Sequence, residues 1–277
     1  MTRPKVAVVT VVRNRLAHLS NVQRGLCECS RDEAGDLCWT VVVIDDPKIE
    51  AWRPSSGIQP KIVSMHADSP HLPIGRARNL GARVALGGGA DVLVFLDVDC
   101  IPSPGLVDAY VDASRHCAEA LLCGPVSYLP PAPPRGYELT ELDRLAEPHP
   151  ARPAPPPGVI LRGGEHRLFW SLSFAVTSTV WRRLGGFHDG YEGYGAEDTD
   201  FGRKAEMLGI DLAWVGGARA YHQHHPVSDP PVEHLEDILR NGALYARRWG
   251  TWPMGGWLNA FEQRGLICPS PEGWTIC

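Results

Sequence analysis

The sequence lacks three features that would quickly assign it to a class of protein. No apolar run reaches the roughly 18 residues that a membrane-spanning helix needs. The eight cysteines are scattered and form no Cys-x-x-Cys pair, which favours reduced thiols over a disulfide framework or a zinc site. Basic residues are not in excess: 27 Lys and Arg against 32 Asp and Glu give a formal net charge of −5, which argues against a nucleic-acid-binding protein.

The first apolar stretch, Val6–Val12, is followed by Arg13-Asn14-Arg15 and not by the small residues of a signal-peptide cleavage site. We therefore expect a buried strand here, no transmembrane segment and a cytoplasmic protein.

Glycine and proline are abundant, with 29 and 25 of 277 residues. Ten of the prolines fall in Leu129–Pro157, a segment that we expect to contain neither a helix nor a central strand. A long loop of this kind inside a compact domain is usually either functional or disordered.

Elsewhere, β-branched runs alternate with amphipathic stretches, which is typical of an α/β protein with a mostly parallel sheet. The expected strands are Val6–Val12, Trp39–Ile44, Lys61–Met65, Asp91–Leu96 and Leu168–Val176, and the longer expected helices include Ile74–Leu86, Glu197–Leu208 and Glu233–Trp249. Polar residues gather at the carboxyl ends of the strands, where open α/β sheets bind their ligands.

Two carboxylates, Asp97 and Asp99, directly follow the buried run Val92–Leu96. Alternate side chains of a strand share a face, so both can reach one ligand. Carboxylates at a strand end suit Mg²⁺ or Mn²⁺ in contact with diphosphate oxygens. The alternative is a solvated loop that happens to hold two acids.

A second motif, Gly193-Tyr194-Gly195-Ala196-Glu197-Asp198, opens an expected helix. The helix dipole alone favours acids there, but it does not explain the glycines, which allow a close approach to a ligand, or Tyr194, which offers a flat face to a sugar ring. A carboxylate in this place can accept a proton from an incoming hydroxyl.

Three histidines, His222, His224 and His225, lie within four residues and indicate metal ligands. No further Cys or His has the spacing of a tetrahedral zinc site, so a mixed site with Asp99 is favoured. Arg78 lies in a helix start that could meet a diphosphate, or it is a solvated helix arginine. Asp46 contacts a base or ribose, or it forms a turn before Pro47.

In this order, Arg13-Asn14, Asp45-Asp46, Gly75–Asn79 and Phe95–Asp99 resemble the nucleotide-sugar half of a GT-A-fold glycosyltransferase, above all of family 2. The segments 184–188 and 193–201 resemble the C-terminal motif of β-1,4-galactosyltransferases and chondroitin-polymerase-type enzymes. The resemblance covers roughly residues 5–225. It implies a Rossmann-like, mostly parallel central sheet flanked by helices in a single domain. That domain comprises a nucleotide-sugar-binding half (1–125), a proline-rich loop (126–160), an acceptor and catalytic half (161–230) and a C-terminal helical extension (231–277).

The resemblance also implies a metal-dependent transfer of a hexose or N-acetylhexosamine from a UDP-sugar to an acceptor hydroxyl. Asp99 and His222 would bind Mn²⁺ or Mg²⁺, with His224 as the alternative ligand. The nucleotide-sugar would contact Arg13, Asp46 at the uracil, Arg78 at the nucleotide or diphosphate, Asp97 at the ribose or metal, and Tyr194.

Within the same resemblance, Asp198 would be the catalytic base, and Glu197 would orient the donor or acceptor. Retaining relatives of the polypeptide N-acetylgalactosaminyl type usually show Glu-Asn here, so Glu-Asp favours inversion through a single displacement. A retaining GT-A transferase, a non-catalytic nucleotide-sugar-binding domain and, with a poorer fit at Cys100, a haloacid-dehalogenase-like phosphatase are the alternatives.

Two departures from the family pattern leave the substrates open. Tyr194 stands where relatives usually have Trp, and Ser171-Leu172-Ser173-Phe174 replaces a segment that contains Gly and Asn. The acceptor could be a soluble metabolite, a peptide or a glycan. We expect Leu129–Pro157 to pass over the acceptor side as a mobile segment, and the C-terminal Trp249, Trp252 and Trp257 to pack rather than to line an acceptor site.

Overall fold

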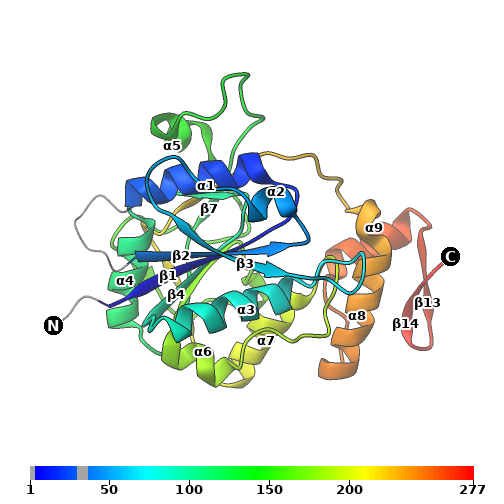
Figure 1. Cartoon of the computed structure of the whole chain (residues 1–277). Coiled ribbons are helices and arrows are strands. Elements are labelled where there is room, and N and C mark those ends of the chain that lie inside the picture. Colours follow the sequence, from blue (N-terminus) through cyan, green and yellow to red (C-terminus); the bar gives the residue numbers. More distant parts are fainter. Residues whose placement is uncertain (1–3, 30–36) are drawn as a thin grey trace.

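A central eight-stranded sheet organises the computed structural model, which describes residues 4–29 and 37–277 (Figure 1). Residues 1–3, which precede the expected first strand, lie outside the described part. The strand order is β3-β2-β1-β4-β10-β6-β11-β9. The bounds are β1 (Val6–Val12), β2 (Leu37–Ile44), β3 (Pro60–Met65), β4 (Val92–Leu96), β6 (Leu121–Cys123), β9 (Ile160–Leu161), β10 (Ser173–Thr177) and β11 (Leu212–Val215).

Most of these strands run in one direction. Strands β3, β2, β1 and β4 are mutually parallel, and β10 is antiparallel to both β4 and β6. Because β11 is parallel to β6 and antiparallel to β9, six of the eight strands point the same way. The expected mostly parallel sheet is therefore confirmed, and β10, from the second expected half, lies between β4 and β6, which both belong to the first.

Helices cover both faces of the sheet (Figure 1). Their bounds are α1 (Leu16–Cys29), α2 (Pro47–Glu50), α3 (Ile74–Gly87), α4 (Leu106–His116), α6 (Ser178–Leu184) and α7 (Glu197–Met207). Alternate residues of β1 enter two separate cores: Val6 and Val8 pack with α1 and α4, whereas Ala7 and Val9 pack with α3, α6 and α7. This burial on both faces explains the continuous apolar runs of the sequence.

A small second sheet, with the order β5-β12-β7-β8, lies beside the end of β4. Its strands are β5 (Cys100–Pro102), β7 (Val126–Tyr128), β8 (Glu147–Pro148) and β12 (Ala220–His222). The antiparallel pair β5 and β12 places His222 opposite Cys100. The register therefore brings His222 next to Asp99, although more than a hundred residues separate them.

The proline-rich segment is more ordered than the sequence suggests. It contains a 3₁₀ turn, η1 (Leu139–Glu141), followed by the short helix α5 (Leu142–Leu145), so the expectation of no helix is wrong. The reason is that no proline occurs between Pro134 and Pro148, which leaves room for a helical turn. Mobility of this segment stays a prediction.

Several contacts anchor that segment to the rest of the fold. The Tyr221 hydroxyl donates to Asp143 at 2.6 Å. The buried Arg152 guanidinium lies 5.2 Å from the ring centroid of Trp170 and 4.8 Å from that of Trp214. These cation–π contacts hold the end of the segment against the sheet.

The expected strand Leu168–Val176 is shorter in the structure. A 3₁₀ turn, η2 (His166–Leu168), comes first, and β10 begins only at Ser173. The backbone carbonyl of Leu172 accepts a hydrogen bond from the Asp97 N–H at 3.0 Å, which ties this bend to the end of β4.

The C-terminal extension packs at one end of the molecule (Figure 1). It comprises η3 (Val232–His234), α8 (Leu235–Trp249), α9 (Gly255–Gln263) and the hairpin β13 (Ile267–Ser270) and β14 (Gly273–Ile276). A disulfide joins Cys268 and Cys277 across this hairpin. The expectation of reduced thiols is therefore wrong for these two cysteines, which the antiparallel pairing of the hairpin brings together. Cytoplasmic localisation stays a prediction.

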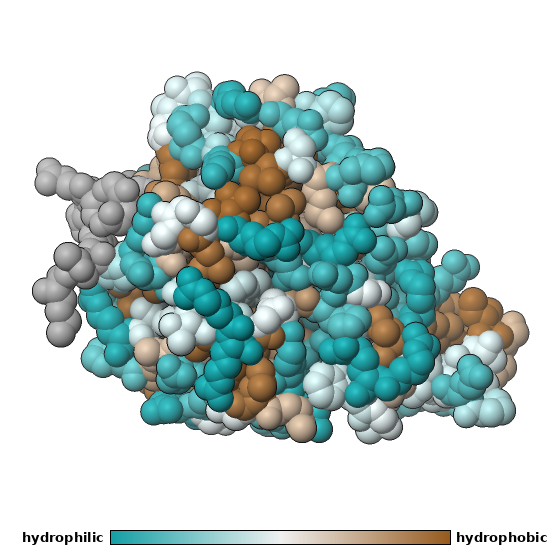
Figure 2. All heavy atoms as spheres, turned by 60° about the horizontal axis from the view of Figure 1, so that its bottom comes forward, coloured by the Kyte–Doolittle hydropathy of each residue, from teal (hydrophilic) through white to brown (hydrophobic). Residues whose placement is uncertain are grey.

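None of the helices within the described residues is both long and apolar enough to cross a membrane. Figure 2 shows one face of the molecule, on which hydrophobic residues gather in separate patches among hydrophilic ones.

Candidate functional site

Asp97 and Asp99 lie in a tight turn between β4 and β5, where the Cys100 N–H donates to the Asp97 carbonyl at 2.9 Å. Because β4 ends at Leu96, the strand alternation expected for the two carboxylates does not apply. Asp97 bonds to Arg78 at 2.7 Å, whereas Asp99 faces His222. The two acids therefore have different protein partners but remain close neighbours, and a ligand common to both stays a prediction.

A cluster of potential metal ligands forms around Asp99. Its Oδ2 lies 3.6 Å from His222 Nε2 and 3.5 Å from His225 Nε2, and the three ligand atoms lie within 4.8 Å of one another. The Gln223 N–H donates to the Asp99 carbonyl at 2.7 Å and fixes the approach of the two segments. One carboxylate and two imidazoles form a donor set that suits a divalent first-row metal such as Mn²⁺.

His225, and not His224, is the second histidine of this cluster. The strand β12 ends at His222, so the two-residue alternation that favoured His224 does not continue. His224 is exposed, and its backbone N–H donates to the Tyr137 hydroxyl at 3.2 Å.

The protonation states of the cluster favour metal binding. Burial acts to raise the pKa of Asp99, but the hydrogen bond with His225 and the charges of His222 and His225 bring it down to about 2. Burial lowers the pKa of His222 below its ordinary value. At neutral pH the site therefore offers an ionised carboxylate and a neutral imidazole, which are the ligating forms.

Arg78, on α3, joins the two acidic motifs. Its side chain is only 4% exposed. The guanidinium donates to Asp97 Oδ1 at 2.7 Å and to Glu197 Oε1 at 3.2 Å, and it lies 5.2 Å from the ring centroid of Phe187. The charge of Arg78 is thus compensated by two carboxylates, and the residue holds the end of β4 against the start of α7.

Glu197 and Asp198 open α7 after Ala196, whose φ of 73° turns the chain sharply into the helix. Asp198 Oδ1 accepts the Thr199 N–H at 2.6 Å and lies 3.3 Å from the Thr199 hydroxyl. Burial and the neighbouring Glu197 raise the pKa of Asp198 to about 7. A carboxyl group with this pKa exchanges a proton readily at neutral pH, as a general base requires.

Asp46 and Arg13 lie at the far end of the site, beyond the ends of β2 and β1. Asp46 is buried, accepts the Asn14 N–H at 2.8 Å and caps α2 through the Ile49 N–H at 3.2 Å. The turn-forming alternative considered for this residue is therefore realised. Arg13 lies near Asp45, whose pKa is lowered by the Ala67 N–H, by His66 and by the charge of Arg13.

Two residues beside the metal-ligand cluster were missed by sequence reasoning. Arg15 lies close enough to contribute to the low pKa of both Asp99 and His222. His18, one turn into α1, lies near Asp99 and both clustered histidines, and burial lowers its pKa. The available signal was the run Arg13-Asn14-Arg15 directly after the first strand.

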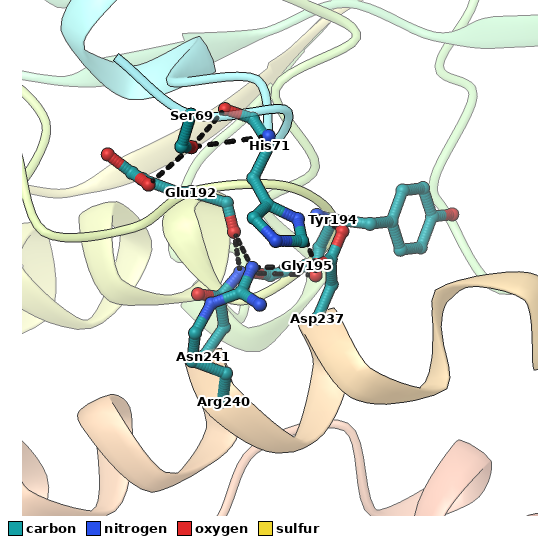
Figure 3. A network of polar contacts seen from close by, with 8 residues as sticks. All are labelled: Ser69, His71, Glu192, Tyr194, Gly195, Asp237, Arg240 and Asn241. Carbon is teal, nitrogen blue, oxygen red and sulfur yellow. Dashed lines mark hydrogen bonds and ion pairs between the residues drawn. The ribbon is translucent and has the colours of Figure 1, made fainter. Parts of the chain in front are cut away.

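The glycine motif is held by α8 (Figure 3). The Tyr194 N–H donates to Asp237 Oδ2 at 3.0 Å. The buried Asn241 amide lies 3.0 Å from the Glu192 carbonyl, 3.2 Å from that of Tyr194 and 2.9 Å from that of Gly195. Sequence reasoning assigned no role to these α8 residues, because nothing in the pattern of a surface helix marks which polar side chains face a loop.

A second part of the same network links α8 to the loop before α3. His71 Nδ1 lies 2.8 Å from Asp237 Oδ1, and Ser69 donates to Glu192 Oε2 at 2.9 Å (Figure 3). The glycine motif is therefore fixed from both sides.

Comparisons with known proteins relate this geometry to glycosyltransferases. Residues 165–226 match the family model described as the N-terminal domain of galactosyltransferase. Polypeptide N-acetylgalactosaminyltransferase 8 of Drosophila melanogaster is 27% identical over 236 residues, which are 79% of this chain and 38% of that protein. The chain thus spans well under half the length of this relative.

Solved structures show the same fold. A crystal structure of GalNAc-T7 with UDP, GalNAc and Mn²⁺ superposes with a TM-score of 0.55 at 17% identity, covering 89% of this chain and 51% of that one. The structure of S. aureus TarS 1-349 gives a TM-score of 0.58 at 12% identity, covering 87% and 64%. The GT-A fold and the relation to glycosyltransferases indicated by the motifs are therefore confirmed.

Proposed function

We propose that the protein is a metal-dependent, inverting glycosyltransferase that moves a hexose or N-acetylhexosamine from a UDP-sugar to an acceptor hydroxyl. One observation carries this proposal: Arg78 bonds to both Asp97 and Glu197, so the two acidic motifs meet in one site. The metal-ligand cluster at Asp99 adjoins the same site.

The donor set of the cluster fits Mn²⁺, and Asp99, His222 and His225 would hold it. When bound, the cation neutralises the charge that develops on the departing diphosphate. Arg15, which directly precedes α1, adds a positive charge near Asp99 that could attract a diphosphate.

Asp198 is the proposed base. With a pKa of about 7 it is ionised in a large fraction of molecules at neutral pH, so it can take the proton of the acceptor hydroxyl as that oxygen attacks the anomeric carbon. Glu197 is held in place by Arg78 at 3.2 Å and so can orient the sugar without acting as the base. Tyr194 is exposed in the neighbourhood of these acids.

A retaining transferase is the second candidate, and the similarity to a polypeptide N-acetylgalactosaminyltransferase supports it. The Glu197-Asp198 pair and the raised pKa of Asp198 support inversion. The two mechanisms give opposite anomers, so NMR of the isolated product distinguishes them through the coupling constant of its anomeric proton.

The direct test is UDP release from a panel of UDP-sugars in the presence of Mn²⁺. We expect release with at least one UDP-hexose or UDP-N-acetylhexosamine, its loss with EDTA and its recovery with added Mn²⁺. Asp198→Asn should bind UDP normally and transfer no sugar. UDP binding without release from any donor would instead favour a non-catalytic nucleotide-sugar-binding domain.

A further inference from the structure

The ring of Tyr194 stands apart from the polar network that fixes its backbone. Figure 3 shows the side chain extending away from Asp237, His71 and Asn241. The backbone is thus clamped to α8 by Asp237 and Asn241, whereas the ring lies outside these polar contacts.

Two aromatic side chains of the C-terminal extension gather around this ring. The His234 ring, on η3, is parallel to that of Tyr194, with 4.3 Å between centroids and an interplanar angle of 11°. The Trp257 ring, on α9, lies 5.7 Å away at 32°. Tyr194 nevertheless keeps 40% of its surface exposed. The Tyr194 ring is therefore partly open to solvent beside two neighbouring aromatic rings.

The aromatic group borders the proposed base. Burial, and after it the charges of Asp198, Glu197 and Glu233, raise the pKa of Tyr194 to about 12. Glu197 and Asp198 follow Tyr194 within four residues, so their carboxylates lie in the neighbourhood of the aromatic surface. A molecule resting on this surface would present its hydroxyls to carboxylate oxygens, which only accept hydrogen bonds.

We propose that Tyr194, His234 and Trp257 form the acceptor-binding surface, and that the acceptor presents a pyranose ring. This proposal rests on the proposed function. The electron-rich faces of aromatic rings attract C–H groups of partial positive charge, and one face of a pyranose consists of such groups. The hydroxyls of that ring lie around its edge, within reach of carboxylates. A peptide without sugar offers no such combination of apolar face and hydroxyl rim.

The surface is built largely by this chain's own extension. His234 and Trp257 both follow residue 226, where the match to the galactosyltransferase model ends. Acceptor choice is therefore shared between Tyr194, which lies in the matched segment with the proposed base, and two residues of the extension. Trp257 also packs against the C-terminal hydrophobic cluster, as expected, and the proposal adds a binding role to that packing.

The test compares acceptor kinetics with nucleotide binding. UDP release is measured with p-nitrophenyl β-glycosides of glucose, galactose and N-acetylglucosamine, and with a Ser/Thr-containing peptide that carries no sugar. We expect a glycoside, and not the peptide, to stimulate release above the slow donor hydrolysis. Trp257→Ala and His234→Ala should each raise the KM for that glycoside about tenfold, the loss of one aromatic contact, with unchanged affinity for UDP and Mn²⁺.

Trp274→Ala is the matched control, because Trp274 belongs to the same C-terminal hydrophobic cluster but not to the aromatic surface. It should leave the KM unchanged. Trp257→Phe keeps an aromatic face and should therefore retain most of the affinity for the glycoside. A purely structural role for Trp257 does not predict this retention. The glycoside should also change the tryptophan fluorescence of the wild type more than that of Trp257→Phe.

Stimulation by the unglycosylated peptide, or a wild-type KM in both alanine variants, would overturn the proposal. The same holds if donor hydrolysis proceeds and no glycoside stimulates it. In each of these cases the proposed function survives, because UDP is still released from the donor. If the wild type neither binds UDP nor releases it, the proposed function fails and this proposal fails with it.

Discussion

The rate of sugar transfer should depend on pH through the ionisation of Asp198. Burial and the charge of Glu197 raise its pKa from 3.8 to about 7. Only the ionised carboxylate can accept the proton, so the active fraction is about one half at pH 7, about one tenth at pH 6 and about one hundredth at pH 5. We therefore expect kcat/KM to fall about fivefold from pH 7 to pH 6 and about tenfold from pH 6 to pH 5.

The assay is UDP release at limiting substrate and saturating Mn²⁺ across pH 5.5 to 9. Acid also protonates the histidines next to Asp99, so the affinity for UDP and Mn²⁺ is measured at every pH, and only points with full occupancy are used. This separates the loss of the base from the loss of the metal.

Two substitutions should shift the acid limb of the kcat/KM–pH profile in opposite directions. The Thr199 hydroxyl, which lies 3.3 Å from Asp198 Oδ1, lowers the pKa of Asp198. Thr199→Ala removes this hydroxyl, so the acid limb of the pH–rate profile should shift to higher pH by up to about one unit. Glu197→Gln removes the neighbouring negative charge, so the limb should shift downward by about the same amount, whatever its effect on the maximal rate. A flat profile down to pH 5.5 in the wild type, or shifts of equal sign in the two variants, would refute the assignment.

Three further outcomes are expected. His225→Ala should weaken Mn²⁺ binding at least tenfold in calorimetry, whereas His224→Ala should not, because of these two histidines only His225 lies close to Asp99. Equal effects of the two substitutions would contradict the assignment of His225 as a metal ligand. The raised pKa of Asp198 means that its carboxylate destabilises the fold as pH rises from about 4 to about 7. Asp198→Asn should therefore raise Tm at pH 8, and a lower Tm would count against the burial of this charge. Gly193→Ala would drive a Cβ into Asp237 at a φ of 75° and should reduce kcat strongly with UDP affinity retained; wild-type turnover would show that the loop tolerates displacement.

The local pattern of apolar and polar residues was sufficient to predict those helices and strands that bury one face or both faces. The runs Val6–Val12 and Val92–Leu96 form central strands as predicted, and the family resemblance correctly placed Asp99 and His222 side by side. The pattern did not predict the partners of residues that lie beyond the end of a regular strand. Because β4 ends at Leu96, Asp97 and Asp99 contact different partners. Because β12 ends at His222, His225 and not His224 lies close to Asp99.

Contacts across long sequence separations were beyond the reach of pattern. Arg78 contacts Glu197 only because α3 and α7 pack on the same face of the sheet. Cys268 and Cys277 pair only because a hairpin aligns them, and the bare spacing of the cysteines contained no sign of it. A helix between prolines, α5, was missed because the proline count was read over the whole segment and not between Pro134 and Pro148.

The clamp made by Asn241 has a consequence for folding cooperativity. One buried amide contacts the carbonyls of Glu192, Tyr194 and Gly195, so the glycine motif cannot open locally while α8 remains folded. The motif and the helix should exchange their amide hydrogens as one unit, with a common opening free energy. The Tyr194 N–H, which is bonded to Asp237, is the reporter of that unit. The stability of the aromatic surface is thereby set by a helix outside the family-matched segment, and substitutions throughout α8 can tune its opening without touching a substrate.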